Sequence, residues 1–440
     1  MKAPIDVLKK AAIYGFGPDG EFPHGVLPNA ASIGAYGAVA GRLATPLEDL
    51  LTVFRRWLHL PDPGALLTIL AAALSNLGAG DPVWLLVVGP PGGGKTEPLR
   101  ALTGLPGIHE AATLTEPALL SGTPKRERPD GAKGGLLREI GDLGIIVCKD
   151  FGSVLSMHRE ARAAVLAALR EIYDGSWTRH LGTDGGRTLH WAGKVGLIAA
   201  CTPAIDSHHA VMGSMGERFV LYRLPEIDGD EQARRALAHI GHEAQMRTEL
   251  AAAVADVLAG ADRDRLVDQS SEEDKERLVT IATLAVRCRS AVERDAYSRD
   301  IELIPASEAP ARLALVLLRL RNGLAALGVD DATTWALVTR CALDSMPALR
   351  RAVLERVVAS HEPTTTTDIA TGVGYPTTTA RRALEDLAAH GVVSRRPQGQ
   401  GKADLWAASE WTLGRWPYPV PETSDRESSP PSSLNYSPNP

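Results

Sequence analysis

The sequence predicts an α/β fold built on a parallel sheet, followed by a helical region and a small C-terminal unit. Continuous apolar runs of strand length occur at Val83–Val88, Leu143–Cys148 and Val195–Cys201, as in central strands buried on both faces. Helical patterns separate these runs, which is the alternation expected of a parallel sheet. After a last strand at Val220–Leu224 the strand signals stop, and long helical segments replace them.

The composition is that of a globular protein with two or three domains. The chain has 440 residues, of which 44% are hydrophobic and 23% charged. Its net charge of −6 gives no overall attraction to nucleic acid, so DNA contacts would depend on local basic patches. The four scattered cysteines lack the spacing of a zinc site and are expected to be buried thiols in a reducing compartment.

No targeting or membrane segment is recognised in the sequence. Met1–Gly15 lacks the apolar core of a signal peptide. The most apolar stretch, Ala65–Leu77, falls short of the roughly 20 residues that span a bilayer. We therefore expect a cytoplasmic protein that does not interact with membranes.

Five regions follow one another along the chain. Residues 1–45 are rich in Gly and Pro and form an irregular lead-in, and residues 46–225 hold the strand–helix alternation. Residues 226–347 are helical, residues 348–412 form a compact unit, and the Pro- and Ser-rich residues 413–440 are expected to be disordered. The helical segments of the middle region are expected at Asp230–Ala259, Glu272–Ala291, Pro310–Leu327 and Thr333–Leu343.

A glycine-rich loop follows the first strand and precedes a helix. Its residues fit the pattern G-x-x-x-x-G-K-[ST] and are Gly89, Pro90, Pro91, Gly92, Gly93, Gly94, Lys95 and Thr96. Glycines let backbone N–H groups turn toward phosphates, and the next helix presents its positive end to them. Lys95 is expected to reach the β- and γ-phosphates, and the Thr96 hydroxyl to bind Mg²⁺. The loop predicts a binding site for ATP and Mg²⁺; the alternative is a loop that only turns the chain.

The second apolar run ends in Lys149-Asp150, where an acidic residue should reach the metal ion and its water. The usual ending is a pair of acids, so Asp150 occupies either the metal-binding position or the water-activating one. A second carboxylate could come from Glu139 or Asp142. Alternatively, Asp150 only caps the helix that follows.

Two further residues complete the predicted catalytic set. Thr202 follows the third strand, where its hydroxyl could lie near the γ-phosphate, or could simply belong to a turn. Arg218 precedes the last strand and is suited to bind the γ-phosphate of a neighbouring subunit, or else is an ordinary surface residue.

Residues 46–224 resemble the ATPase module of AAA+ proteins, which are P-loop NTPases. The resemblance rests on the order of the glycine-rich loop, Asp150, Thr202 and Arg218, and it makes the following helical region a lid. The stretches Gly134–Cys148 and Ile172–Thr178 are more closely similar to the minichromosome-maintenance helicases and related AAA+ proteins. This resemblance implies a homo-oligomer that acts on DNA. It also makes Arg312, near the start of a lid helix, a second candidate arginine for nucleotide contact.

The same resemblance implies a β-hairpin that points into a central pore. The hairpin is expected at Trp177–Trp191, with a favoured Asp184-Gly185 turn. Arg179, His180 and Arg187 could bind the phosphates of single-stranded DNA, unless the hairpin is only structural. A second basic loop at 122–133 is either another pore loop or a solvated run of charges.

Residues 348–412 resemble the winged helix-turn-helix domains of ArsR- or MarR-type regulators. The pattern is a first helix, a short helix at Thr367–Thr371, a second helix at Thr377–His390 and a basic hairpin. The expected duplex DNA contacts are Thr377, Thr378, Thr379, Arg381 and Arg382 in the major groove and Arg395, Arg396 and Lys402 on phosphates. A winged helix used for protein contacts is the alternative.

The leading hypothesis is therefore an oligomeric AAA+ ATPase that acts on DNA as a helicase-like motor or a helicase loader. A replicative partner is a further expectation. Two rivals stay open. One is an ATP-switched transcription regulator, and the other is a scaffold that binds ATP and hydrolyses it weakly because the acidic pair is incomplete.

Overall fold

The structure is a computed structural model that describes residues 45–122, 133–182, 186–209, 217–360, 362–399 and 402–419. The predictions for the lead-in, the basic loop, the hairpin turn and the tail therefore fall largely or wholly outside the described residues. Within these residues the central element is a five-stranded sheet of order β2-β3-β6-β1-β7. Its strands are β1 Trp84–Val88, β2 Ile108–Glu110, β3 Leu143–Cys148, β6 Lys194–Cys201 and β7 Phe219–Arg223.

All four strand pairings in this sheet are parallel, which confirms the predicted parallel sheet. The carboxyl ends of the strands therefore meet along one edge, here called the carboxyl edge, and their beginnings meet along the opposite amino edge. Strand β2 was not predicted, because three residues carry too little periodic signal.

Helices cover both faces of the sheet. The elements of this region are α3 Thr45–Trp57, α4 Gly64–Leu77, α5 Thr96–Arg100, α6 Glu116–Leu119, α7 Leu136–Ile140, α8 Gly152–Leu155, α9 Arg159–Tyr173, the hairpin strands β4 Ser176–Leu181 and β5 Arg187–Ala192, and the 3₁₀-helix η2 Pro203–His208. Side chains of β1 alternate between two cores, as the pleat of a strand requires: Leu85 and Val87 join one, and Leu86 and Val88 the other.

Helix α4 runs along the sheet from the carboxyl edge to the amino edge. At its start, Asp62 accepts a 2.7 Å hydrogen bond from the Tyr222 hydroxyl near the end of β7. At its other end, the Asn76 amide forms two 2.8 Å hydrogen bonds with the backbone of Val83, just before β1. These two contacts fix the direction of α4.

The helical region contains α11 Gly229–Ala238, α12 Glu243–Gly260, η3 Arg263–Leu266, α13 Glu272–Arg289, the short strands β8 Glu293–Arg294 and β9 Ile301–Leu303, α14 Ala311–Ala326 and α15 Asp331–Asp344. The single helix predicted at Asp230–Ala259 is wrong. The structure has two helices there, because the chain turns at Gly241, whose φ of +84° suits glycine.

Helix α14 packs antiparallel to α4. Arg319 donates a 2.5 Å hydrogen bond to the Ser75 carbonyl, and Gly323, one turn later, lies against Ala71. A Cβ at Gly323 would come 2.4 Å from the Ala71 carbonyl oxygen, so only glycine allows this approach. Helix α14 therefore begins at the amino edge and ends toward the carboxyl edge.

The open side of the edge strand β7 is closed by side chains from the end of α15. The Ser345 hydroxyl accepts a hydrogen bond from Leu221 N at 3.0 Å, and an Asp344 carboxylate oxygen accepts one from Arg223 N at 2.8 Å. Unpaired strand edges invite pairing with other chains, and these two contacts cover the edge.

The C-terminal unit has the predicted order of elements. It consists of α16 Ala348–Val358, β10 Thr364–Thr365, α17 Thr366–Val373, α18 Thr377–Ala389, β11 Val393–Arg396, β12 Leu405–Ala408 and α19 Glu410–Leu413, with sheet order β10-β12-β11. The cap of α17 is Thr365, whose hydroxyl accepts a hydrogen bond from Asp368 N.

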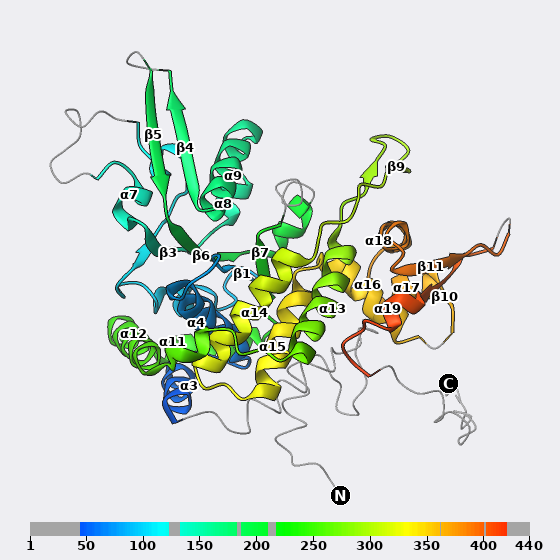
Figure 1. Cartoon of the computed structure of the whole chain (residues 1–440). Helices are drawn as coiled ribbons and strands as arrows, with labels where there is room; N and C mark the ends of the chain where they lie inside the picture. Colours follow the sequence, from blue (N-terminus) through cyan, green and yellow to red (C-terminus); the bar gives the residue numbers. More distant parts are fainter. Residues whose placement is uncertain are drawn as a thin grey trace, which may run out of the picture.

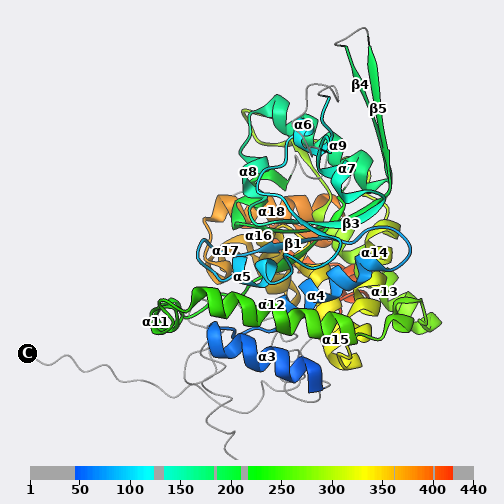
Figure 2. The same ribbon diagram turned by 90° about the vertical axis from the view of Figure 1, so that its left-hand side faces the viewer.

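In Figure 1 the sheet and its helices lie at one end, with α11 and α12 of the helical region below the sheet beside α3. Helices α13, α14 and α15 lie in the middle, and the C-terminal unit lies at the other end. The β4–β5 hairpin stands out from the sheet in both Figure 1 and Figure 2. Among the helices of the described residues, none has the length and apolar character needed to cross a membrane.

Candidate nucleotide site

The glycine-rich loop joins β1 to α5 at the carboxyl edge. Gly92 and Gly94 have φ values of +74° and +80°, a region that side chains with a Cβ rarely adopt. A Cβ on Gly93 would come 2.9 Å from the Pro90 carbonyl oxygen. The glycines at these positions are therefore required by the shape of the loop, and that shape fits a phosphate chain.

Lys95 folds over the loop. Its ammonium group donates hydrogen bonds to the carbonyl oxygens of Gly89 at 2.7 Å and Pro90 at 2.5 Å. Burial lowers the pKa of Lys95, while the nearby Cys201 and Asp150 raise it. The charge of Asp150 therefore acts on Lys95, and Thr96, the next residue, is exposed at the start of α5.

Helix α11 reaches the same loop. The Gln232 side chain donates a 2.7 Å hydrogen bond to the Gly92 carbonyl oxygen. Arg235, three residues later, donates to the carbonyl oxygens of Arg55 and Leu58 at the end of α3. The first helix after the sheet is thus attached both to the loop and to the segment that precedes α4, a contact that the sequence pattern did not reveal.

Asp150 follows β3 and Thr202 follows β6, so both residues lie at the carboxyl edge, as does the loop after β1. Asp150 is exposed, and its Oδ1 atom accepts a 2.9 Å hydrogen bond from Gly152 N, so it does cap the following turn. Its other oxygen accepts no hydrogen bond from the described residues. Thr202 follows β6, which lies between β3 and β1. Lys95, Asp150 and Thr202 are therefore brought to one edge, as expected.

The expected sources of a second carboxylate are wrong for this chain. Glu139 lies in α7 and Asp142 just before β3, both at the amino edge, whereas Asp150 follows the other end of a strand about 20 Å long. The carboxylate near Asp150 along the edge is instead Glu110 of β2, which forms an ion pair with Lys149. That pair neutralises Lys149. It could not be predicted from the sequence, because β2 is too short to show a strand pattern.

No group of three His, Cys, Asp or Glu side chains among the described residues is arranged to hold a metal ion. Mg²⁺ in nucleotide sites is usually held by one or two protein ligands together with phosphate oxygens and waters. Thr96 and Asp150 are the residues that would hold it, and they fit this sparse ligand set.

A cavity adjoins the loop on the side of α4. Lys95, Gly93 and Gly94 line it together with His59, Leu60, Pro61, Asp62, Ala65, Leu66, Ile69, Val87, Pro98, Leu224, Pro225 and Ile227. Most of these side chains are apolar. The cavity therefore joins a phosphate-shaped loop to an apolar chamber, which suits a molecule with an anionic tail and a flat apolar end.

Arg218 lies at the amino edge, because it precedes β7. Its side chain is 6% exposed, so the alternative interpretation as an ordinary surface residue is wrong. The guanidinium group forms an ion pair with Asp174 at 2.8 Å and lies 5.3 Å from the centre of the Tyr173 ring. It cannot reach the loop of its own chain, because the length of the sheet separates them. Its role toward a neighbouring subunit stays a prediction.

Arg312 lies at the same amino edge, because α14 begins there. It forms a 3.3 Å ion pair with Glu308, which also pairs with the buried Arg289. Burial raises the pKa of Tyr173 to about 12, and the charges of Arg312 and Arg218 act against that rise. Both candidate arginines are thus close to Tyr173, and the structure does not bring Arg312 to the loop of its own chain.

The predicted hairpin is confirmed, since β4 pairs antiparallel with β5 and Trp177 lies opposite Trp191. Its two faces differ. On one face Arg179 donates to Glu116 at 2.8 Å and to the Leu120 carbonyl at 2.7 Å, and Arg187 approaches the Gly122 carbonyl at 3.5 Å.

The other face of the hairpin carries uncharged polar pairs. Thr178 and His190 form a 3.0 Å hydrogen bond, and His180 and Thr188 form one of 3.1 Å. All four residues are exposed. Of the three hairpin residues predicted to contact DNA, His180 faces outward, whereas Arg179 and Arg187 face the α6 segment.

In the C-terminal unit, the first turns of α18 are open. Thr377, Thr378, Arg381 and Arg382 are exposed, Thr379 is half-buried, and Arg395, Arg396 and Lys402 on the hairpin side are exposed. Arg381 pairs with Glu385 and Arg395 with Asp404. The far half of α18 is held by Arg294 and Arg350, which both bind Asp386.

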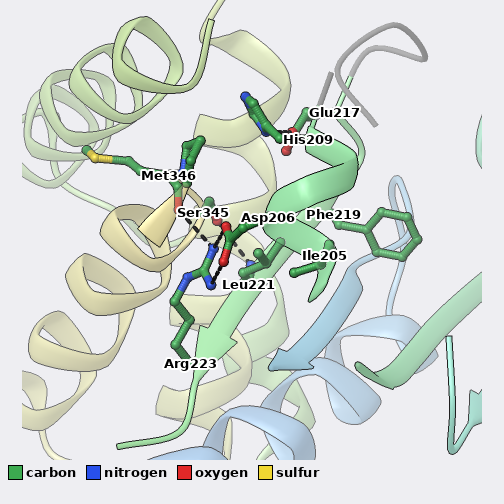
Figure 3. A pocket seen from close by; sticks show the side chains of 10 residues that line it. Ile205, Asp206, His209, Glu217, Phe219, Leu221, Arg223, Ser345 and Met346 are labelled. Carbon is green, nitrogen blue, oxygen red and sulfur yellow. Dashed lines mark hydrogen bonds and ion pairs between the residues drawn. The ribbon is translucent and has the colours of Figure 1, made fainter. Parts of the chain in front are cut away.

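A polar pocket connects the segment after Thr202 to the C-terminal unit (Figure 3). Asp206 of η2 binds the Arg223 guanidinium through two 2.8 Å hydrogen bonds and also accepts one from Ala348 N, at the start of α16. Glu217 also lines this pocket. Burial raises the pKa of its carboxyl group, but Arg289 and His209 together lower it by more, so the pKa lies below its ordinary value. These contacts join the sheet directly to α16.

Comparisons with known proteins give limited matches. Residues 350–410 match the model of a family described as FaeA-like protein. No curated protein matches the chain. Because the matched segment is a small part of the chain, it describes the C-terminal unit alone.

The solved structures that are similar to the chain include the following two. One is the C-terminal region of NrS-1 in its apo A form, with 14% identity, a TM-score of 0.24 and coverage of 56% of this chain. This chain spans about half, 55%, of that structure's length. The other is the active helicase Cch of SCCmec type IV, with 10% identity, a TM-score of 0.32 and coverage of 85% of this chain and 72% of the helicase. Both TM-scores are too low to support an argument about this chain.

Proposed function

We propose that this chain is an ATPase of the AAA+ type that binds ATP and Mg²⁺ at the loop Gly89–Thr96 and acts on DNA. The observation that carries the proposal is the meeting of Lys95, Asp150 and Thr202 at the carboxyl edge beside a loop whose glycines have the required conformations. Bound Mg²⁺ would supply charge neutralisation at the phosphates.

The residues have distinct proposed roles. The loop amides and Lys95 bind the phosphates, for which Lys95 must exchange the carbonyl oxygens of Gly89 and Pro90 for phosphate oxygens. Thr96 and the free oxygen of Asp150 hold the metal ion, and Thr202 orients water or the γ-phosphate. Hydrolysis with a single acidic residue at this position is expected to be slow.

Nucleotide binding is tested with a labelled ATP analogue and Mg²⁺. Lys95→Ala should abolish binding, whereas Lys275→Ala, on the exposed surface of α13, should leave it unchanged. Asp150→Asn should bind ATP with nearly normal affinity and lose turnover. Normal hydrolysis by Asp150→Asn would show that the assignment of this strand is wrong.

The DNA function is supported by two surfaces. One is the exposed start of α18 with Arg381 and Arg382, which is suited to a major groove, and the other is the outward face of the β4–β5 hairpin. We propose that the chain forms a homo-oligomer in which that hairpin contacts single-stranded DNA, as a helicase-like motor or a loader.

ATPase and strand-displacement assays separate this proposal from its rivals. Stimulation of turnover by single-stranded DNA supports the motor or loader. A preference for one duplex sequence without such stimulation identifies an ATP-switched regulator. ATP binding without turnover, in the presence of either DNA, identifies a scaffold.

A further inference from the structure

His59 has a buried nitrogen that nothing in the described part of the chain satisfies. Its Nε2 atom is inaccessible to solvent and has no hydrogen-bond partner among the described residues. Buried polar atoms in folded proteins are nearly always paired, so an orphaned one calls for an explanation. His59 lines the cavity that Lys95, Gly93 and Gly94 also line. A ligand held by the loop can therefore reach the half-buried His59 ring, and the ring must turn toward the cavity for Nε2 to contact that ligand.

The surroundings of His59 suit a flat aromatic ring. The cavity wall near His59 comes from two segments. The link between α3 and α4 contributes Leu60 and Pro61, and the segment after β7 contributes Leu224, Pro225 and Ile227. These side chains offer apolar surface and few polar atoms. A nucleobase placed there would bury its faces against apolar groups and would require a polar partner only at its edge.

The His59 ring is suited to be that partner in its neutral form. Burial lowers the pKa of His59, and the Arg235 guanidinium lowers it further, while Glu231 and Asp228 on α11 act in the opposite direction. A neutral imidazole has one nitrogen that accepts a hydrogen bond and one that donates. With the proton on Nδ1, Nε2 is an acceptor.

We propose that His59 selects the base of the bound nucleotide, with its Nε2 atom accepting a hydrogen bond from the 6-amino group of adenine. This inference rests on the proposed nucleotide function of the loop and adds the residue that distinguishes one nucleotide from another. Guanine carries an oxygen at the same position, so GTP would place two acceptors face to face. The site should therefore prefer ATP over GTP.

The test measures dissociation constants of the full chain with Mg²⁺ for ATP, GTP, purine riboside triphosphate and inorganic tripolyphosphate. Purine riboside triphosphate lacks the 6-amino group, and tripolyphosphate lacks the base. The unmodified protein should bind ATP about tenfold more tightly than purine riboside triphosphate or GTP, as expected for one buried hydrogen bond. His59→Ala should bind these three about equally, with tripolyphosphate affinity unchanged.

Two further variants sharpen the result. His242→Ala removes an exposed histidine on the neighbouring segment and should keep the full preference for ATP. His59→Asn retains an acceptor and should keep part of it. A preference for ATP that survives His59→Ala would overturn the inference, as would equal binding of ATP and purine riboside triphosphate by the unmodified protein.

Failure of this inference differs from failure of the proposed function. If Lys95→Ala abolishes binding of all four compounds while His59→Ala changes none, the loop binds phosphates and His59 does not read the base. If the unmodified protein binds neither ATP nor tripolyphosphate, the nucleotide site itself is refuted.

Discussion

At the scale of single residues, Lys194 at the start of β6 is a cation in a costly position. Its ammonium group donates a 2.6 Å hydrogen bond to the Gly78 carbonyl. The pKa of Lys194 is lowered from 10.5 to about 8, mainly by burial and also by the charge of Arg319, while Asp81 acts in the opposite direction. In the folded chain this lysine therefore loses its proton more readily than in the unfolded chain.

The stability of the protein should respond to this shift in alkaline solution. Between about pH 8 and 10.5 the unfolded state binds more protons at Lys194 than the folded state, so this residue contributes increasing stability as pH rises. We expect the melting temperature of the unmodified protein, relative to Lys194→Met, to increase across that range. Thiols and phenols that titrate there are common to both proteins and cancel. A constant difference would show that Lys194 keeps its ordinary pKa.

At the scale of elements, the two faces of the β4–β5 hairpin make separable predictions. Arg179 is 15% exposed and tied to Glu116, so Arg179→Ala should loosen the hairpin from α6 and lower the melting temperature. His180 and His190 each hydrogen-bond with a neighbouring threonine on the exposed face. The double variant His180→Ala, His190→Ala should leave the melting temperature unchanged.

Measurements of DNA affinity then show whether the outward face of the β4–β5 hairpin contacts DNA. We expect the double histidine variant to lower the affinity for a single-stranded oligonucleotide several-fold, measured by fluorescence anisotropy at fixed salt. Its unchanged folding serves as the internal control. An affinity equal to that of the unmodified protein would remove the outward face from the proposed function.

The sequence predicted elements well where the signal was long and continuous. Strands β1, β3 and β6 and the glycine-rich loop were found because buried parallel strands read as uninterrupted apolar runs. Strands β2, β8 and β9 were missed because two or three residues show no period. The break at Gly241 was missed because the helical pattern continues on both sides of it.

Residue roles were harder to predict than elements, because they depend on which edge of the sheet a side chain reaches. The positions of Lys95, Asp150 and Thr202 follow from strand direction alone. The inward orientation of Arg179, the pairing of Lys149 with Glu110 and the orphaned nitrogen of His59 all depend on packing between segments distant in sequence. No local pattern records such contacts.

At the scale of the whole molecule, Asp386 links the C-terminal unit to the helical region. Arg294 binds it at 2.7 Å and Arg350 at 2.9 Å, and Arg350 also donates to the carbonyl oxygens of Cys288 and Ser290. Both arginine side chains are about nine-tenths buried. Removal of the Asp386 carboxylate would deprive two buried guanidinium groups of a shared ion-pair partner. This should lower the free energy of unfolding by about 3 kcal/mol or more.

We expect Asp386→Ala to weaken the attachment of the C-terminal unit. Calorimetry should show a separate, earlier melting transition for that unit, where the unmodified protein shows a shared one. Asp331→Ala, at a residue with a 76% exposed side chain, is the matched control and should leave the profile unchanged. A single transition at the original temperature for Asp386→Ala would show that the apolar contacts alone hold the unit.

The separation of the two edges of the sheet has a consequence for mixtures of two inactive variants. Strand β6, with eight residues, is about 26 Å long, so Lys95 and Arg218 of one chain cannot meet at one phosphate. In the proposed homo-oligomer, in which Arg218 acts on the nucleotide of a neighbouring subunit, the two defective proteins Lys95→Ala and Arg218→Ala should therefore complement each other when mixed. A copy with an intact loop would receive an intact arginine from its neighbour. Restored turnover in the mixture would mean that the working catalytic unit is shared between two polypeptides and belongs to neither alone.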